Sequence, residues 1–313
     1  MNDMYLGIDT SNYTSSCAVY DSKKNVFFSE KQLLPVADGQ LGLRQSDAVF
    51  HHVRNLPPLL SGLCEKYAGD IRAVGSSYAP RDAEGSYMPC FSVGTGFADV
   101  LSASFKARKY SFSHQAGHIA AALWSSGRTD LVDKKFIAFH VSGGTTDVLH
   151  VKPDSENIFS IDMIASSLDL KAGQAVDRVG VMLGLGFPAG VMLDRLSLES
   201  DREYRIKPFM KDGSCSFSGV ENKCASMLAN GEKHEDIAKY CISYVYAAIR
   251  AMTEAALAKA GELPLIYAGG VMSNTYIKNK ITAEFSAHFA DPYYSSDNAC
   301  GTAYLTYLKE LNG

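Results

Sequence analysis

Two stretches of the chain share one pattern, Tyr5-Leu-Gly-Ile-Asp-Thr-Ser-Asn-Tyr-Thr-Ser-Ser-Cys-Ala-Val-Tyr20 and Phe136-Ile-Ala-Phe-His-Val-Ser-Gly-Gly-Thr-Thr-Asp-Val-Leu-His-Val151. In each, an apolar strand leads into a turn of small residues, and a second apolar strand follows. Their separation of about half a chain is typical of a duplicated domain. Such turns leave backbone N–H groups uncovered, so two of them facing across a cleft would bind opposite ends of a polyphosphate. An ordinary hairpin turn is the alternative.

The duplicated pattern predicts an α/β protein with two domains around a central cleft, the actin-like, sugar-kinase-like ATPase fold. A length of 313 residues is enough for two domains of about 150 residues each. We expect a first domain over residues 1–131, a second over 132–296, and a C-terminal helix, 297–313, that returns to the first domain.

Composition limits the possible partners and the cell compartment. The net charge of −4 argues against a chain that holds nucleic acid by its overall charge, so binding RNA would need a local basic patch or a basic partner. Seven cysteines without a CxxC pair indicate reduced thiols. With no signal-peptide pattern and no apolar run long enough to span a membrane, we expect a cytoplasmic protein.

Local patterns predict the main elements. Strands are expected at 25–32, 110–113 and 158–164, and helices at 47–67 (interrupted near Pro57 and Pro58), 115–125, 172–183, 220–228, 235–260 and 299–311. Residues 76–96 are rich in Gly, Pro and Ser and predict a functional loop that ends at a helix near Phe97. Asp297 and Asn298 are expected to cap the last helix.

Two Gly-rich turns are candidate ligand sites. Gly184 to Gly190 predicts a tight turn before another helix. Residues 263–274 predict a buried strand that opens on Gly269 and Gly270 at the start of a helix, a place suited to the ribose or phosphate of a nucleotide.

The strongest metal signal is His114-Gln-Ala-Gly-His118. Its two imidazoles stand one helical turn apart on one face, close enough to share a metal ion. Two ligands are insufficient, so a carboxylate must come from elsewhere. The alternative is a pair of surface histidines. No glutamate follows His114, so the general base of an HExxH zinc protease is missing and a peptidase is not supported.

Seven motifs, in order and spacing, resemble the universal tRNA threonylcarbamoyladenosine synthase family over nearly the whole chain. They are His114 to His118, Ser142-Gly-Gly-Thr-Thr146, Ala172-Gly-Gln-Ala-Val-Asp177, Leu183-Gly-Leu-Gly-Phe-Pro-Ala-Gly190, Ser216-Phe-Ser-Gly219, Ala268-Gly-Gly-Val-Met-Ser-Asn274 and Ser296-Asp-Asn298.

The resemblance implies a role for each matching position. His114, His118 and Asp297 would be the ligands of one divalent metal, iron or zinc, with open positions for an oxygen of the substrate. The turn Ser142, Gly143, Gly144 and Thr145 would lie over the phosphates of ATP or an acyl-adenylate. The nucleoside would be held by Asp177, Gly190, Asp194, Gly269, Gly270 and Asn274, an aspartate being suited to a pair of ribose hydroxyls.

The chain also departs from the family pattern. Asn12-Tyr13-Thr14 replaces the usual Cys-Asp-Glu, Thr145 replaces a histidine, and Ala116 replaces the glutamate between the two histidines. The usual Gly-Pro-Gly region has become residues 77–89. Asp9 remains in the first turn, where it would either orient a metal-bound water as a catalytic residue or cap the hairpin.

The resemblance implies metal-dependent transfer of a threonylcarbamoyl group from threonylcarbamoyl-AMP to the N6 amine of the adenosine beside a tRNA anticodon. Because of the departures, two alternatives stay open. One is a related ATP-dependent carbamoyl- or acyltransferase with another acceptor, and the other is a non-catalytic subunit that binds nucleotide. We expect this chain alone to bind tRNA weakly, to act with companion subunits of a tRNA-modification complex and not to associate with membranes. A dimer is one assembly that the sequence leaves open.

Overall fold

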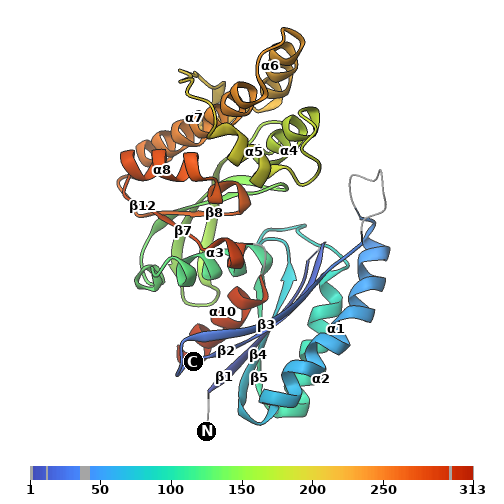
Figure 1. Ribbon diagram of the computed structural model, residues 1–313. Helices are drawn as coiled ribbons and strands as arrows, with labels where there is room; N and C mark the ends of the chain where they lie inside the picture. The colour runs from blue at the N-terminus through green and yellow to red at the C-terminus, as the bar shows by residue number, and fades with distance from the viewer. Residues whose placement is uncertain (1–2, 12, 36–42, 296–297, 313) are drawn as a thin grey trace. The chain divides into compact units, whose positions relative to one another are not determined.

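The computed structural model describes residues 3–11, 13–35, 43–295 and 298–312 (Figure 1). The chain divides into two compact units. Unit 1 comprises the described residues up to Ser125, Asp154–Phe159 and the described residues from Tyr293 onward, and unit 2 comprises Ser126–Pro153 and Ser160–Pro292.

Unit 1 is built on a mixed five-stranded sheet in the order β3-β2-β1-β4-β5. The first three strands form an antiparallel meander, while β4 and β5 continue the sheet in parallel with β1. The bounds are β1 (Met4–Ser11), β2 (Thr14–Asp21), β3 (Val26–Leu33), β4 (Ile71–Ala79) and β5 (Arg108–Ser113). Every residue of β1 except Ser11 is buried, as expected for a central strand covered on both faces.

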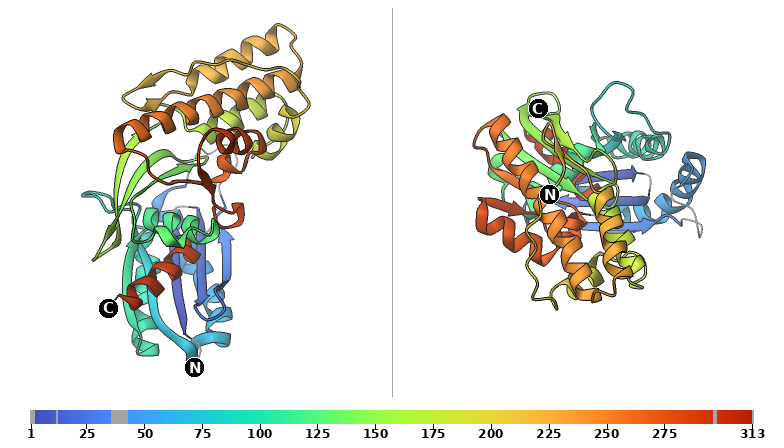
Figure 2. Two further views of the ribbon diagram at one scale, coloured as in Figure 1. Left: turned by 90° about the vertical axis from the view of Figure 1, so that its left-hand side faces the viewer. Right: turned by 90° about the horizontal axis from the view of Figure 1, so that it is seen from above.

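Helices cover both faces of this sheet. Helices α1 (Gln45–Tyr67) and α2 (Phe91–Phe105) lie on one face, whereas α3 (His114–Ser125) and α10 (Ala299–Leu311) lie on the other (Figures 1 and 2). Two glycines permit the close approach of α10. A Cβ on Gly7 would stand 2.3 Å from the Ala303 backbone nitrogen, and a Cβ on Gly301 would stand 1.9 Å from the Gly117 carbonyl oxygen.

Unit 2 repeats the sheet of unit 1. Its order is β12-β11-β6-β7-β8, which places corresponding strands at corresponding positions. The bounds are β6 (Phe136–Val141), β7 (Thr146–Asp154), β8 (Ile158–Ser166), β11 (Leu265–Ala268) and β12 (Ala287–Phe289). Strand β6 pairs antiparallel with β7 and parallel with β11, as β1 does with β2 and β4. The duplicated α/β architecture predicted from the two hairpins is therefore confirmed.

A helical layer packs on the sheet of unit 2. The long helix α7 contacts most of the other helices in this layer (Figure 2), and one core joins sheet residues such as Phe139 and Val148 to helix residues such as Val179 and Ile242. The helices are α4 (Ala172–Met182), α5 (Gly190–Ser197), α6 (Ser218–Ala229), α7 (His234–Ala260) and α8 (Thr275–Glu284). The remaining elements are the hairpin β9 (Met210–Lys211) and β10 (Ser214–Cys215), the one-turn helix α9 (Pro292–Ser295), and 3-10 turns at Ala68–Asp70, Thr129–Leu131 and Gly270–Ser273.

The predicted interruption of the first helix is wrong. Helix α1 runs through Pro57 and Pro58 without a break. An interior proline costs about 3 kcal/mol. The buried leucines of α1, each contributing about 1.5–3 kcal/mol by burial, offset this cost. They are Leu56, Leu60 and Leu63.

The loop expected over residues 76–96 is also shorter than predicted. Its first residues belong to β4, and α2 begins at Phe91 rather than near Phe97. Gly94 lies in the first turn of α2, and glycine weakens the helical pattern of the sequence there. Its N–H donates to Thr10 Oγ1, and a Cβ at Gly94 would stand 2.8 Å from that oxygen, so a tertiary contact selects glycine here.

The predicted cap of the last helix is only partly testable, since Asp297 lies outside the described residues. Asn298 is the N-cap of α10, but its side chain makes no capping hydrogen bond. That side chain is used elsewhere, as described below. No helix in the described part of the chain is long and apolar enough to cross a membrane.

Candidate metal and nucleotide sites

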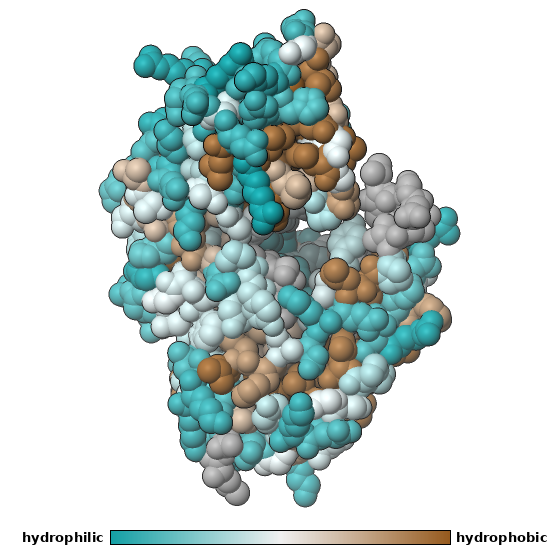
Figure 3. Space-filling view, in the orientation of Figure 1, coloured by the Kyte–Doolittle hydropathy of each residue, from teal (hydrophilic) through white to brown (hydrophobic). Residues whose placement is uncertain are grey.

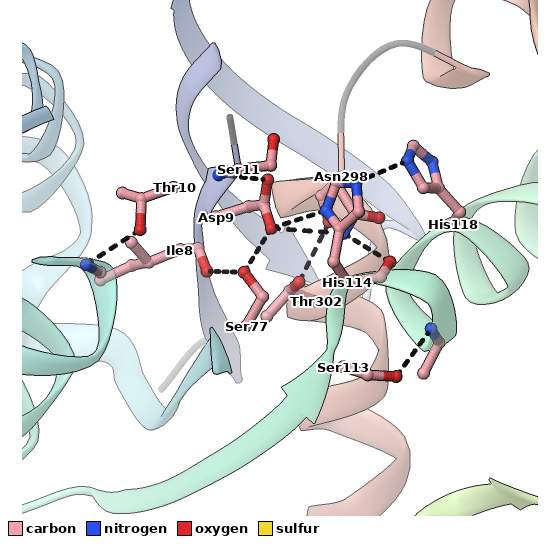
Figure 4. Close-up of polar contacts among 12 residues, drawn as sticks. Ile8, Asp9, Thr10, Ser11, Ser77, Ser113, His114, His118, Asn298 and Thr302 are labelled. Carbon is pink, nitrogen blue, oxygen red and sulfur yellow. Dashed lines mark hydrogen bonds and ion pairs between the residues drawn. The ribbon is translucent and has the colours of Figure 1, made fainter. Parts of the chain in front are cut away.

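A buried polar cluster lies at the end of β1 in unit 1. Asp9 is 1% exposed, and the described groups that are hydrogen-bonded to its carboxylate are all able to donate (Figure 4). Oδ1 accepts from Ser77 Oγ and lies 3.0 Å from His114 Nδ1. The Ser11 backbone N–H donates to Oδ2 over 3.3 Å. The charge of Asp9 is thus held by several partners and not by solvent.

The two histidines of α3 meet at their outer nitrogens. His114 Nε2 and His118 Nε2 are 3.0 Å apart, as the spacing of one helical turn predicts (Figure 4). Two nitrogens at 2.0–2.1 Å from one ion are about 2.9 Å apart in octahedral geometry and about 3.4 Å apart in tetrahedral geometry. The pair therefore has the spacing of two ligands to one metal.

Asn298 joins this cluster from the start of α10. Its Nδ2 donates to the His114 carbonyl oxygen over 2.8 Å and lies 3.4 Å from Asp9 Oδ1. The Asn298 side chain thereby connects α10 to both the strand and the histidine helix. Its Oδ1 is buried and has no hydrogen-bond partner among the described residues.

Burial alone would raise the pKa of Asp9. The positive charge that His114 carries when it is protonated, and the hydrogen bonds from His114, Ser77 and Ser11, outweigh that effect and hold the pKa of Asp9 well below its ordinary value of 3.8. Asp9 is therefore ionised at neutral pH.

The third predicted ligand, Asp297, lies outside the described residues. Within the described ranges no group of three or more His, Cys, Asp or Glu side chains is arranged to hold a metal. The structure thus places two of the three predicted ligands, and the full set stays a prediction.

In unit 2, the turn after β6 is held by its own serine. Ser142 Oγ accepts from the N–H groups of Gly144 and Thr145, over 3.3 and 3.1 Å. A Cβ on Gly143 or Gly144 would meet nothing within 4 Å, so open space adjoins both residues. Across the turn, Gly173 at the start of α4 packs so closely that a Cβ there would stand 2.6 Å from the Gly143 nitrogen.

A cavity of about 510 Å³ in unit 2 brings most of the predicted nucleotide residues together. Its wall includes Gly143, Asp177, Gly190, Asp194, Gly270 and Asn274. Ser142, Gly144, Thr145 and Gly269 do not line it, although each is next to a residue that does or lies in the same turn. Gly269 has a φ of +100° and approaches the Val141 carbonyl closely, so its role in the fold is a backbone one.

The two aspartates of the cavity are positioned by backbone N–H groups. Asp177 Oδ1 accepts from Ala189 N over 2.8 Å, and Asp194 Oδ2 accepts from Thr275 N over 3.0 Å. Burial raises the pKa of Asp177, and the hydrogen bond from Ala189 opposes that shift. Asp194 Oδ1 is buried without a partner among the described residues, and a ligand hydroxyl donating to it would satisfy this atom.

Asn274 also has a structural role, because its Oδ1 caps α8 by accepting from Ile277 N over 3.0 Å.

Apolar side chains complete the cavity, including Val176, Val191, Leu198 and Val271. Exposed hydrophobic residues continue outside it on α4, α5 and the loop between them. They are Val181, Phe187 and Met192, and Figure 3 shows hydrophobic surface over this part of unit 2.

Sequence reasoning did not assign Ser77, Asn298 or Gly173 to a site. Ser77 lies inside the segment singled out as a functional loop, and Asn298 follows the predicted ligand Asp297. In each case the sequence pattern included the residue but gave it no role in a site. A hydrogen bond between β4 and β1, or between α10 and α3, depends on tertiary packing that no local pattern specifies.

Solved structures define the class of protein to which these units belong. Full-length HypF in a phosphate- and nucleotide-bound form matches 98% of this chain and 55% of its own, with a TM-score of 0.63 and 12% identity. Component A of the (R)-2-hydroxyglutaryl-CoA dehydratase of Acidaminococcus fermentans matches 99% of each chain, with a TM-score of 0.60 and 17% identity. At these identities the likeness shows the fold alone, which is that of the actin-like ATPases.

Sequence comparison then defines the family. The family model of TsaD, tRNA N6-adenosine threonylcarbamoyltransferase, matches residues 36–304, so the chain belongs to this family. The tRNA N6-adenosine threonylcarbamoyltransferase of Mycoplasma mobile is 27% identical over 97% of both chains. The family predicted from the seven motifs is confirmed.

Proposed function

We propose that this protein transfers a threonylcarbamoyl group from threonylcarbamoyl-AMP to the N6 amine of the adenosine beside a tRNA anticodon. The observation that carries the proposal is the pair of Nε2 atoms of His114 and His118, 3.0 Å apart, in a chain that belongs to this transferase family. In the proposed reaction, residues of unit 1 hold a metal and residues of unit 2 hold the adenylate.

The cavity of unit 2 fits an adenosine nucleotide. The unpartnered Asp194 Oδ1 would accept from a ribose hydroxyl, and apolar side chains such as Val191 and Val271 would pack on the base. Gly143 has no side chain in the open space beside the turn, so a phosphate could approach its backbone. These features suit a ligand with an apolar part, a hydroxyl group and an anionic end.

His114, His118 and, as the resemblance implies, Asp297 would hold one iron or zinc ion. When bound, such an ion supplies Lewis-acid stabilisation of negative charge on a carbamoyl or phosphate oxygen. Asp9 and Asn298 hold His114 in place, which keeps its Nε2 directed toward His118. Water exclusion around the labile mixed anhydride would protect it from hydrolysis.

The alternative is a carbamoyl or acyl transfer from an adenylate to an acceptor other than tRNA. The hairpin after β1 favours it, because Tyr13 and Thr14 stand where the resemblance places an acidic pair, and Tyr13 is 47% exposed. Thr145 likewise replaces a histidine in the second turn. These changes leave the metal and nucleotide residues intact and alter side chains expected near the acyl group.

We propose that tRNA binding depends on companion subunits. The chain has a net charge of −4, and attraction of an RNA backbone requires concentrated positive charge. A companion protein that contributes basic surface would supply it.

Reconstitution tests the proposal. Purified protein, threonylcarbamoyl-adenylate, unmodified tRNA and the companion subunits of the same genome are mixed, and the modified nucleoside is quantified by mass spectrometry. The proposal predicts product above the no-enzyme background that disappears with His118→Ala. If metal and nucleotide bind but no modified nucleoside forms, the alternative transferase is favoured.

A further inference from the structure

We infer that Asp9 is a positioning residue that fixes the tautomer of His114, so that His114 Nε2 carries the lone pair required by a metal ion. This inference rests on the proposed metal site and deepens it. Asp9 then acts through His114 and touches neither metal nor substrate, in contrast to the catalytic role expected from its place in the first turn.

The first step concerns the proton on His114 Nδ1. An ionised carboxylate only accepts hydrogen bonds, and Asp9 Oδ1 lies 3.0 Å from this nitrogen. The contact is favourable only when Nδ1 carries the proton. A neutral imidazole protonated on Nδ1 has its lone pair on Nε2, which is the atom that faces His118 Nε2.

Asn298 also borders His114 Nδ1, and its orientation follows from its other neighbours. Its Nδ2 lies 2.8 Å from both the His114 carbonyl oxygen and His114 Nδ1. If the amide were turned over, its oxygen would face that carbonyl oxygen and the Asp9 carboxylate, and two acceptor pairs would repel. The amide hydrogens therefore go to the carbonyl and to Asp9. The Asn298 nitrogen then stands 2.8 Å from the protonated Nδ1 with no hydrogen bond between them, so the position of the His114 proton is set by the charged contact with Asp9.

Burial makes this arrangement rigid. Asp9 is 1% exposed, whereas the His114 side chain is 23% exposed and is the part of the cluster open to a ligand. Ser77 on β4 and the Ser11 backbone hold the carboxylate from two further directions. An enclosed carboxylate with these partners cannot present a free oxygen to a water molecule, so orientation of the ring is the role that its geometry allows.

A carboxylate behind a ligating histidine raises the basicity of the ring and fixes its orientation. Loss of such a partner typically weakens metal affinity by about 10- to 100-fold. We expect Asp9→Asn and Asp9→Ala to weaken binding of Co²⁺ or Zn²⁺ to the full-length protein by that amount. His-selective ¹⁵N NMR of the metal-free protein should also show the Nδ1–H tautomer of His114 in the wild type and a loss of that preference in Asp9→Asn.

Asp21 provides a matched control. It is also 1% exposed and lies in the same sheet, where Oδ1 accepts from the Lys23 and Lys24 N–H groups far along the chain from the histidines. Asp21→Asn should leave metal affinity and the His114 tautomer unchanged even if it lowers the melting temperature. Should Asp9→Ala fail to fold, the isosteric Asp9→Asn still gives the result.

The outcomes separate the two proposals. If the wild type binds metal and Asp9→Asn binds it equally well, with an unchanged His114 signal, the positioning role is wrong and the proposed function stands. If Asp9→Asn and Asp21→Asn weaken binding equally, the effect is a general consequence of a buried charge and the inference also fails. Wild-type protein that binds neither Co²⁺ nor Zn²⁺ would overturn the metal site itself.

Discussion

Units 1 and 2 place a hairpin at the same position of the same sheet, yet the two hairpins carry opposite kinds of chemistry. The turn after β1 begins beside a buried carboxylate that is hydrogen-bonded to an imidazole. The turn after β6 has glycines with open space around them and no charged side chain between Ser142 and Thr146. The same sheet architecture thus carries a hydrogen-bonded polar cluster in unit 1 and a glycine turn with exposed backbone in unit 2.

The difference follows from what packs on each hairpin. In unit 1, α3 and the start of α10 bring His114 and Asn298 onto Asp9. In unit 2, α4 begins with Ala172 and Gly173, whose small size lets the helix start contact the turn directly. A helix start rich in polar side chains fills the space beside a strand end, whereas one made of small residues leaves it for a ligand.

The largest effect is expected at the histidine pair. His118→Ala removes one of two nitrogens that face each other, and a site with a single remaining imidazole should lose stoichiometric iron or zinc. Metal content of the purified protein, measured by elemental analysis, checks this expectation. His234→Ala, a change at the start of α7 in unit 2, is the control and should retain the metal. Full retention in His118→Ala would show that the metal site is elsewhere.

A large effect confined to nucleotide binding is expected at the second turn. Gly143→Val places a branched side chain in space that is empty in the fold, so the protein should remain folded while phosphate is excluded. Affinity for ATP measured by calorimetry should fall about a hundredfold or more, the equivalent of about 3 kcal/mol. Lys233→Ala, at an exposed position, should bind ATP as the wild type does, and unchanged affinity in Gly143→Val would argue against a phosphate at this turn.

A smaller loss is expected on the nucleoside side of the cavity. Asp194→Ala removes the buried Oδ1 that has no protein partner, and a hydrogen bond to a charged group is worth about 1.5–3 kcal/mol. Adenosine nucleotides should therefore bind about tenfold more weakly at the lower bound of that range. Asp169→Ala is the matched control, because Asp169 accepts from the Phe217 and Ser218 N–H groups outside the cavity. Equal losses in both variants would point to altered packing and not to a ribose contact.

The smallest effect concerns acid stability of the metal-free protein. The pKa of Asp9 is lowered by folding, so its stabilising contribution is complete above the unfolded value near 3.8 and is lost as the pH falls toward the folded value. Wild-type melting temperature should therefore decrease below about pH 4, partly through this group. Asp9→Asn should be less stable at neutral pH and show a shallower decrease in acid. Parallel pH profiles of the two proteins would contradict the assigned shift.

The fold was largely predictable from the sequence, because both hairpins carry apolar strands around turns of small residues. The predicted boundaries of α3, α4, α6 and α7 lie within one or two residues of those observed, and the predicted last helix coincides with Ala299–Leu311. The start of α2 was missed because Gly94 was selected by contact with Thr10, and α1 continues through two prolines because its leucines are buried. Tertiary contacts, which a local pattern does not contain, decided both cases.

The candidate sites were predictable to a different extent. The spacing of His114 and His118 gave their shared face directly, and the motifs gave residues that line the unit 2 cavity. The partners of Asp9 were not predictable, because β4, α3 and α10 reach it from positions far apart in the chain. Which nucleotide residues line a wall and which only shape a turn, such as Gly269, also required the structure.

The central claim is that unit 1 binds metal and unit 2 binds nucleotide. The most direct test measures two affinities for both His118→Ala and Gly143→Val. One is the affinity for metal, and the other is the affinity of the chelator-treated protein for ATP. Our account predicts that His118→Ala loses metal and keeps the ATP affinity of the metal-free wild type, while Gly143→Val loses ATP and keeps metal. If either variant loses both ligands while remaining folded, or if His118→Ala loses ATP and keeps metal, the division between the units is wrong.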